Sequence, residues 1–215
     1  DPNLYERAAH PCHKDAFLPP GEMLVMHVSN FRPVKRIADV IRIFARIHQR
    51  VRSKLVLVGD GPERPIATAE ADALGITDRV IFLGKQDSVA ELLTCADLLL
   101  LPSQNESFGL VALEAMASGV PVVASRAGGL PEVVEDGVTG HLGEVGDVES
   151  MAEMGISILS DNRRWLAMSI AAQTVAAERF GVDVIVPQYE RYYQRVLAND
   201  SAPAAEPLLA AAGDD

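Results

Sequence analysis

Residues 24–58 read LVMHVSNFRPVKRIADVIRIFARIHQRVRSKLVLV and decide the fold of this chain. An apolar run, Leu24–Val28, is followed by a polar and basic loop, and a second apolar run, Leu55–Val58, ends the stretch. Between the two runs, apolar residues recur at the spacing of a helix that buries one face, at Ile37, Val40, Ile41, Phe44 and Ile47. This order of strand, helix and strand predicts a right-handed crossover between two parallel strands.

The same alternation continues along the chain. Three more apolar runs of strand length follow, at Val80–Leu83, Leu98–Leu101 and Val120–Ala124. Mostly uninterrupted runs of this kind are typical of strands that are covered on both faces. The predicted fold class is therefore α/β, a Rossmann-like doubly wound parallel sheet, in which ligands bind at the loops that follow the strands.

The two ends of the chain differ from this alternating core. Residues 1–22 contain four prolines and no sustained periodicity, which indicates a linker before a domain at residues 23–197. Residues 198–215 combine prolines, an alanine run and acidic ends, which predicts a disordered tail. After about residue 148 the strand signal stops, and helices are expected at Met151–Leu159, Arg163–Phe180 and Val182–Leu197.

The composition restricts the function classes. With 48% apolar and 23% charged residues, the chain of 215 residues can bury an ordinary globular core. Its net charge of −11 disfavours nonspecific binding to nucleic acid or to anionic membranes. No apolar run approaches the roughly 18 residues of a membrane span, and the first residues lack the pattern of a signal peptide. Cys12 and Cys95 are too few and too poorly placed for a disulfide framework, so we expect a reducing cytoplasm.

The loop after the first strand concentrates positive charge in an acidic chain. It reads Ser29-Asn30-Phe31-Arg32-Pro33-Val34-Lys35-Arg36 and directly precedes a predicted helix. A guanidinium and an ammonium beside a helix N-terminus suit a diphosphate, because they add to the partial positive charge of the unpaired backbone N–H groups. The alternative is a solvated turn that happens to carry two basic side chains.

The loop after the fourth strand, residues 102–114, is the second candidate. Ser107 is the expected N-cap of the next helix, and Gly109 would let a ligand approach the N–H groups of its first turn. Glu114 would lie about two turns into the helix, roughly 8–10 Å from its start, which is the reach from a diphosphate to its ribose. Glu106, just before the helix, would bind sugar hydroxyls or steady positive charge at the reacting carbon. Alternatively, Glu106 only favours the helix dipole and Glu114 is a surface acid.

Other motifs carry weaker signals. Gly59 closes the second strand and Gly84-Lys85-Gln86-Asp87 follows the third, so both turns could present backbone groups to a nucleotide. His10, Cys12 and His13 lie in the linker without a fourth ligand, so no metal site is predicted. The chain lacks both the GxxxxGK[ST] phosphate loop and the GxGxxG fingerprint, which removes the main support for an NTPase or a dinucleotide-dependent dehydrogenase.

With these motifs in view, residues 1–197 resemble the C-terminal domain of the family 4 retaining glycosyltransferases, which have the GT-B architecture of two Rossmann-like domains. The family's two glutamates, separated by seven residues, match Glu106 and Glu114. Its donor-binding arginine and lysine match Arg32 and Lys35. The resemblance implies a hexosyltransferase that binds a nucleotide sugar and needs neither a metal nor a cofactor.

The resemblance also implies a role for each matched residue. Arg32 and Lys35 would stabilise the leaving diphosphate, and Glu114 would bind the ribose. Glu106, with the backbone of residues 108–111, would hold the sugar and the diphosphate. The predicted catalytic residues are Arg32, Lys35 and Glu106. The predicted donor-binding residues are Ser29, Asn30, Arg32, Lys35, Gly59, Lys85, Gln86, Glu106, Ser107, Phe108, Gly109, Leu110, Val111 and Glu114.

The stretches His27–Arg36 and Phe82–Asp87 resemble one subgroup in particular, which acts at the first step of bacillithiol biosynthesis. This resemblance implies UDP-N-acetylglucosamine as the donor and L-malate as the acceptor. Nothing in the chain resembles the N-terminal domain that binds the acceptor, so we expect the isolated chain to bind the donor weakly and to transfer little or nothing. The alternatives are a glucosyl- or mannosyltransferase of polysaccharide or glycolipid synthesis, and a noncatalytic nucleotide-binding domain.

Overall fold

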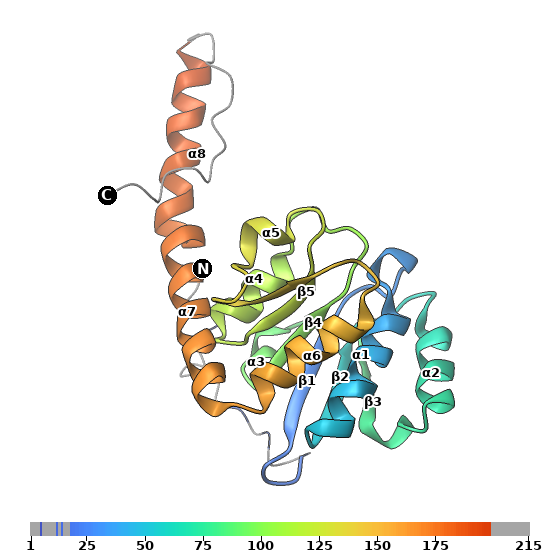
Figure 1. Cartoon of the computed structure of the whole chain (residues 1–215). Coiled ribbons are helices and arrows are strands. Elements are labelled where there is room, and N and C mark those ends of the chain that lie inside the picture. Colours follow the sequence, from blue (N-terminus) through green and yellow to red (C-terminus); the bar gives the residue numbers. More distant parts are fainter. Residues whose placement is uncertain (1–4, 6–11, 13, 15–17, 199–215) are drawn as a thin grey trace.

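The computed structural model describes residues 5, 12, 14 and 18–198 of the chain. In this part of the chain, six parallel strands form one sheet in the order β3-β2-β1-β4-β5-β6 (Figure 1). The strands are β1 (Met23–Val28), β2 (Ser53–Val58), β3 (Val80–Gly84), β4 (Leu98–Leu101), β5 (Val122–Ser125) and β6 (Gly140–Gly143). The predicted α/β fold with a doubly wound parallel sheet is therefore confirmed.

The order of the strands reverses between β1 and β4. Strand β1 pairs with β2 along its whole length on one side, and with β4 through Val25 and Met26 on the other. From this point the chain builds the sheet outward in both directions. In sheets of this order, ligands bind in the crevice outside the carboxyl ends of the strands at the point of reversal. The loops that follow β1 and β4 are therefore the first place to look for a functional site.

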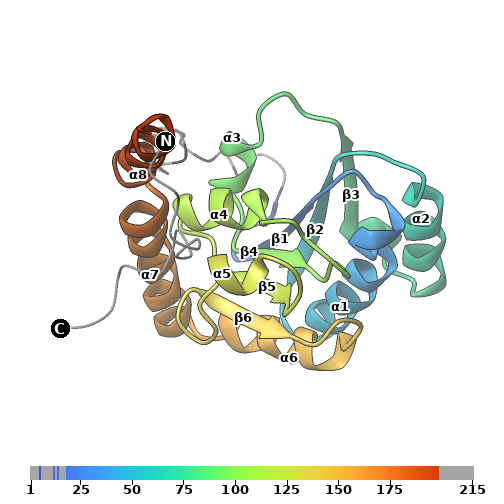
Figure 2. The ribbon, with the colours of Figure 1, turned by 90° about the horizontal axis from the view of Figure 1, so that it is seen from above.

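Helices cover both faces of the sheet (Figure 2). Helix α1 buries the five apolar residues that the sequence predicted as its inner stripe. One buried cluster joins the sheet to α1 (Ile37–Arg50), α2 (Arg64–Ala73) and α6 (Val148–Leu159). A second cluster, on the opposite face, joins it to α3 (Ala90–Leu93), α4 (Leu110–Ala117), α5 (Leu130–Val133) and α7 (Asn162–Phe180). Two short 3-10 turns, η3 (Pro33–Lys35) and η4 (Thr77–Arg79), precede α1 and β3.

Helix α8 (Val182–Leu197) follows α7 and extends beyond the sheet (Figure 1). None of its residues is buried, although its bounds agree with those predicted from the sequence. None of the helices in the described part of the chain is long and apolar enough to cross a bilayer.

Three strands differ from the prediction by two residues or more, and one of them is β2, which begins at Ser53 instead of Leu55. Strand β6 was not predicted, because the residues Gly140-His141-Leu142-Gly143 contain no apolar run. Strand β5 begins at Val122 instead of Val120, since Pro121 has no N–H group for the sheet and contributes only its carbonyl, which accepts from Leu99 N at 3.0 Å. The differences at β5 and β6 lie on the half of the sheet beyond β4.

The two cysteines form a disulfide, contrary to the expectation that they were poorly placed for one. Cys12 and Cys95 are 83 residues apart in the chain, yet their Cα atoms are 5.1 Å apart. An ion pair between Lys14 and Asp97 adjoins the disulfide, and the Asp97 carboxylate also accepts from the backbone N–H of Leu24 at 2.6 Å. Cys12 and Lys14 are thereby attached next to the start of β4. Sequence separation alone could not reveal this neighbourhood.

Candidate functional site

The loops that follow β1 and β4, residues 29–36 and 102–109, meet at the point of strand reversal. We call them the β1 loop and the β4 loop. The Gln104 N–H of the β4 loop donates to the Val34 carbonyl of the β1 loop at 2.8 Å. Beside this bond, Lys35 Nζ donates to Glu106 Oε1 at 2.6 Å. The structure thus brings together a predicted phosphate ligand and a predicted sugar ligand that are 71 residues apart.

The ion pair between Lys35 and Glu106 is largely shielded from solvent. The two side chains are 20% and 14% exposed, respectively. The hydroxyl of Ser103, which is fully buried, donates to the same Glu106 oxygen at 2.9 Å. Sequence reasoning did not single out Ser103, although its position two residues after an apolar strand was a usable signal. This hydrogen bond orients the Glu106 carboxylate and holds the β4 loop near its start.

Arg32 presents a different basic group. Its side chain is exposed, and within the described residues no ion pair or side-chain hydrogen bond engages it. The backbone turns back at η3, where Lys35 N donates to Arg32 O at 2.8 Å. Of the three cations in the β1 loop, Lys35 and Arg36 are already paired, with Glu106 and Asp39, whereas Arg32 faces solvent at the same end of the sheet.

Glycines allow the neighbouring loops to pack closely on this site. A Cβ atom on Gly59, after β2, would lie 1.8 Å from the Ser29 carbonyl oxygen. A Cβ atom on Gly128, after β5, would lie 1.9 Å from the Glu106 carbonyl oxygen, and Gly129 N donates to that oxygen at 2.8 Å. Gly59 thus supports the β1 loop from one side, and the two later glycines support the β4 loop from the other.

Helix α4 begins later than predicted. Its N-cap is Gly109, with φ 93°, and the exposed Ser107 caps nothing, so the prediction of Ser107 as N-cap is wrong. The left-handed conformation at Gly109 turns the chain into the helix without a side-chain cap. The first N–H groups of α4, at Leu110 and Val111, have no partner within the helix and remain suited to an anion.

Glu114 therefore lies about one turn into α4, roughly 6 Å from its start, rather than two turns. Burial raises the pKa of its carboxyl group above the ordinary value, and a hydrogen bond from the Tyr5 side chain only partly offsets this effect. In turn, burial and then the charge of Glu114 raise the pKa of the Tyr5 hydroxyl. Glu114 is thus a half-buried acceptor that a tyrosine hydroxyl already uses.

His27 is a polar residue of the site that sequence reasoning missed. It is fully buried near the end of β1, where Nδ1 lies 2.8 Å from the Leu100 carbonyl oxygen and Nε2 lies 2.8 Å from Ser29 Oγ. Burial lowers its pKa to about 4, so the ring is neutral at neutral pH. A lone histidine within an apolar strand was the signal that could have drawn attention to it.

The remaining predicted residues are spread more widely. Asn30 is exposed on the β1 loop, and Lys85 and Gln86 are exposed after β3, where Gln86 Nε2 donates to the Leu83 carbonyl. Phe108 is half-buried and contacts Phe180 edge to face, with ring centroids 5.8 Å apart. The structure brings the β1 and β4 loops together, but no hydrogen bond or ion pair among the described residues joins these loops to Lys85 or Gln86.

For metal binding, the described residues contain no group of three or more His, Cys, Asp or Glu side chains arranged around one point. His10 and His13 lie outside the described residues, and Cys12 is held in the disulfide.

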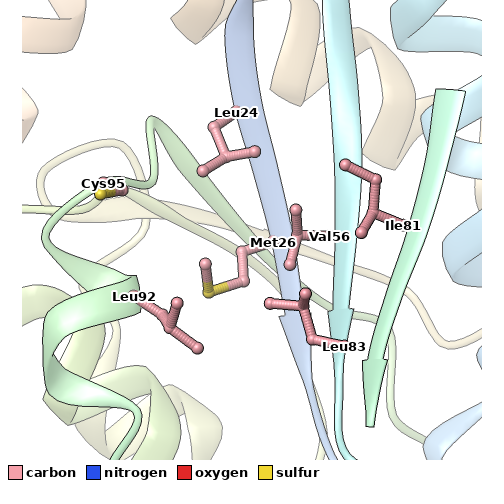
Figure 3. Close-up of a pocket in the computed structure, with 7 residues that line it drawn as sticks. All are labelled: Leu24, Met26, Val56, Ile81, Leu83, Leu92 and Cys95. Atoms are coloured by element: carbon pink, nitrogen blue, oxygen red, sulfur yellow. The ribbon is translucent and has the colours of Figure 1, made fainter. Parts of the chain in front are cut away.

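An apolar cavity of about 260 Å³ is lined by residues outside the two loops (Figure 3). Its walls come from strands β1, β2 and β3 and from α3 and the turn after it, at Leu24, Met26, Val56, Ile81, Leu83, Leu92 and Cys95. The lining side chains are uncharged and have no polar atoms other than the sulfurs of Met26 and of the disulfide-bonded Cys95, so a nucleotide would find no strong hydrogen-bonding partner there.

Most of the chain matches a known protein family. Residues 12–175 match the model of the glycosyl transferases group 1 family. The chain belongs to this family. The matched range includes the sheet, both loops and the start of α4, which are the parts that form the candidate site.

Individual relatives give a more detailed picture. The chain is 50% identical over 180 residues to N-acetyl-alpha-D-glucosaminyl L-malate synthase of Bacillus anthracis, covering 84% of this chain and 47% of the relative. It is 37% identical over 199 residues to a D-inositol 3-phosphate glycosyltransferase of Mycolicibacterium smegmatis, covering 87% and 44%. This glycosyltransferase chain thus spans about half the length of the curated relatives that it matches.

Among solved structures, the chain resembles HepE of Anabaena in complex with UDP. The TM-score is 0.81 at 29% sequence identity, covering 90% of this chain and 55% of HepE. HepE was also solved in complex with UDP-glucose.

Proposed function

We propose that this chain is the donor-binding half of a retaining, metal-independent family 4 glycosyltransferase. The whole protein would transfer N-acetylglucosamine from UDP-N-acetylglucosamine to L-malate. The observation that carries the proposal is the meeting of Lys35 with Glu106 at the point of strand reversal, just before the first turn of α4. The relative of 50% identity, named as a glucosaminyl malate synthase, supports the choice of donor and acceptor.

The proposed chemistry depends on negative charge that develops on the leaving diphosphate. Arg32 and Lys35, together with the N–H groups at the start of α4, would stabilise that charge as the bond to the sugar breaks. Fixed cations and N–H dipoles in this arrangement would do the work that a metal ion does in other transferases, so the proposal includes neither a metal nor a cofactor. Glu106 would steady the sugar, and Glu114 would accept hydrogen bonds from the ribose.

The acceptor belongs to the part of the enzyme that this chain does not include. We therefore propose that the chain alone binds donor weakly and transfers little or nothing. We also propose a cytoplasmic location, as expected for an enzyme that uses a soluble nucleotide sugar. There the disulfide between Cys12 and Cys95 would be reduced, since disulfides rarely persist in that compartment.

The first test is calorimetric titration of the chain with UDP, UDP-N-acetylglucosamine, UDP-glucose and GDP-mannose, with and without EDTA. We expect uridine-selective binding that EDTA does not change. Arg32→Ala and Lys35→Ala should each weaken UDP binding by about 1–3 kcal/mol, because each removes a charge-assisted contact. The matched control is Arg191→Ala, which removes an exposed cation on α8.

Each other outcome would indicate a different function. A preference for GDP-mannose or UDP-glucose would point to a glycosyltransferase of polysaccharide or glycolipid synthesis. Unchanged UDP affinity in both loop variants would contradict the assignment of the diphosphate to the β1 loop. If UDP-N-acetylglucosamine binds but the full-length enzyme transfers no sugar to malate, the malate acceptor is wrong.

A further inference from the structure

A chain of three hydrogen bonds, one buried and two partly buried, links the β1 loop to β4. The backbone N–H of Phe31 donates to Ser29 Oγ at 3.2 Å, and Ser29 Oγ lies 2.8 Å from Nε2 of His27. Nδ1 of His27 lies 2.8 Å from the carbonyl oxygen of Leu100, in β4. The chain therefore crosses from the β1 loop to the strand that leads into the β4 loop.

The direction of each hydrogen bond follows from the groups involved. The Leu100 carbonyl can only accept, so Nδ1 of His27 carries the proton. In the neutral ring Nε2 is then bare, and it accepts from the Ser29 hydroxyl. Because its proton points to His27, the Ser29 oxygen has a lone pair free for the Phe31 N–H. Each donor and each acceptor in the chain has one role, and no other tautomer satisfies all three contacts.

The chain of hydrogen bonds ends in the β1 loop at a residue with an uncommon backbone conformation. Phe31 has φ 41°, a left-handed backbone that a bulky residue rarely adopts, and its side chain is fully buried. Such residues persist only where the surroundings determine them. Three contacts hold Phe31 in this conformation. Its backbone N–H donates to the Ser29 hydroxyl, and its carbonyl accepts from the Glu63 N–H at 2.9 Å. Its ring stacks on the ring of His27, with the two centroids 6.3 Å apart.

We propose that His27 and Ser29 are positioning residues that set the conformation of Phe31 and thereby place the next residue, Arg32, for the diphosphate. This inference rests on the proposed function for the role of Arg32. It changes the role predicted for Ser29, whose hydroxyl is engaged within the protein on both sides and supports the loop instead of binding the donor. Neither His27 nor Ser29 touches the reacting atoms.

The first test needs no ligand. Nitrogen NMR of the full chain should show the proton of His27 on Nδ1 and an unprotonated Nε2. Ser29→Ala should speed hydrogen exchange at the Phe31 amide by about tenfold, and Ser29→Thr, which keeps the hydroxyl, should restore slow exchange. The matched control is Ser53→Ala, which removes another buried serine hydroxyl, bonded to the Val51 carbonyl before β2. A proton on Nε2, or equal exchange rates in Ser29→Ala and Ser53→Ala, would overturn the proposal.

The second test separates positioning from simple packing. Ser29→Ala should weaken UDP binding by about three- to tenfold in calorimetry. In the Ser29→Ala background, Arg32→Ala should have a much smaller effect than in the wild type, because the arginine is no longer held in place. In the Ser53→Ala background its effect should be unchanged. Additive losses from Ser29→Ala and Arg32→Ala would show that Ser29 does not act through Arg32.

The two proposals can fail separately. If the wild-type chain binds no UDP, the proposed function fails, and the exchange rate of Phe31 and the His27 tautomer still decide whether this chain of hydrogen bonds sets the loop. If UDP binds but the exchange rate does not respond to Ser29→Ala, the positioning role fails alone.

Discussion

Glu106 and Glu114 lie at the same end of the sheet with seven residues between them, yet their surroundings are opposite. Glu106 accepts from Lys35 and from the buried Ser103 hydroxyl, so its negative charge is matched by a cation and a hydroxyl. Glu114 is half-buried on α4, and burial raises its pKa. The hydrogen bond from Tyr5 satisfies part of its need for a donor but brings no positive charge.

The difference shows that one end of a sheet can combine polar groups that are already paired within the protein with a polar group that still lacks hydrogen-bond donors. Around Glu106, the polar groups already have partners, and His27 and Ser29 fix the loop behind Lys35. Around Glu114, the carboxylate has more to gain from a ligand, since ribose hydroxyls could supply the donors that it lacks. Acid should affect the two parts with opposite sign, because His27 has a lowered pKa and Glu114 a raised one.

The largest expected effect is the pH dependence that His27 imposes on stability. Its pKa is about 4 in the folded chain, against 6.5 for the ordinary value. Above pH 6.5 the His27 ring is mostly neutral in both the folded and the unfolded chain. As the pH falls from 6.5 towards 4, His27 binds a proton in the unfolded chain but stays neutral in the folded chain. The free energy of unfolding therefore falls by about 3 kcal/mol in total. Urea unfolding of wild type and His27→Gln over this range should show a steeper loss in the wild type.

Glu114→Gln is the matched control for that experiment. A raised folded pKa means that the folded chain takes up the proton of Glu114 at higher pH than the unfolded chain does, so this group favours folding as the pH falls. Removing it should steepen the loss of stability on acidification, whereas removing His27 should flatten it. Parallel pH profiles for wild type and His27→Gln would mean that the ring is not the buried neutral group described above.

The next effect compares the same substitution at the two glutamates near neutral pH. Glu106→Gln leaves Lys35 without a negative partner at a largely shielded position, so it should lower the free energy of unfolding by about 1–3 kcal/mol. Glu114→Gln removes a charge that burial disfavours, so it should leave stability unchanged or raise it by up to about 1 kcal/mol. Urea unfolding of both variants measures the contrast, with the exposed Glu132→Gln as a control. Equal losses of stability in Glu106→Gln and Glu114→Gln would contradict the view that only Glu106 is balanced by a positive partner.

The sequence predicted the sheet better than it predicted the site. Mostly uninterrupted apolar runs identified five strands because parallel strands bury both faces. Strand β6 was missed because two of its four residues are glycines. The basic β1 loop and the two glutamates were recognisable because charges next to apolar runs are conspicuous. The start of α4 was misplaced, since Ser107 and Gly109 can both precede a helix and only the backbone at Gly109 shows which residue does so.

Contacts between distant segments were beyond the reach of the sequence. The hydrogen bonds of His27 depend on Leu100, 73 residues away, and on a register between β1 and β4 that no local pattern encodes. The disulfide between Cys12 and Cys95 was missed for the same reason. Local periodicity therefore predicts which elements form, whereas the polar contacts that position the site follow from how those elements come together.

The smallest expected effect concerns Tyr5. It tests whether the Tyr5 hydroxyl competes with the ribose for the Glu114 carboxylate. The Tyr5 hydroxyl donates to the carboxylate that we assign to the ribose, so ribose binding must break or share this hydrogen bond. Tyr5→Phe keeps the ring and removes the donor, and it should raise the affinity for UDP by about two- to fivefold, which is a fraction of one hydrogen bond to a charged group. Calorimetric titration of the variant measures this, with Tyr192→Phe on the exposed face of α8 as the control. In the Glu114→Gln background, Tyr5→Phe should have no effect on UDP affinity, because the hydroxyl no longer competes with ribose for a carboxylate. An equal gain in both backgrounds would show that Tyr5 acts on the nucleotide by another route, and a loss of affinity would show that its hydroxyl supports Glu114 instead of occupying it.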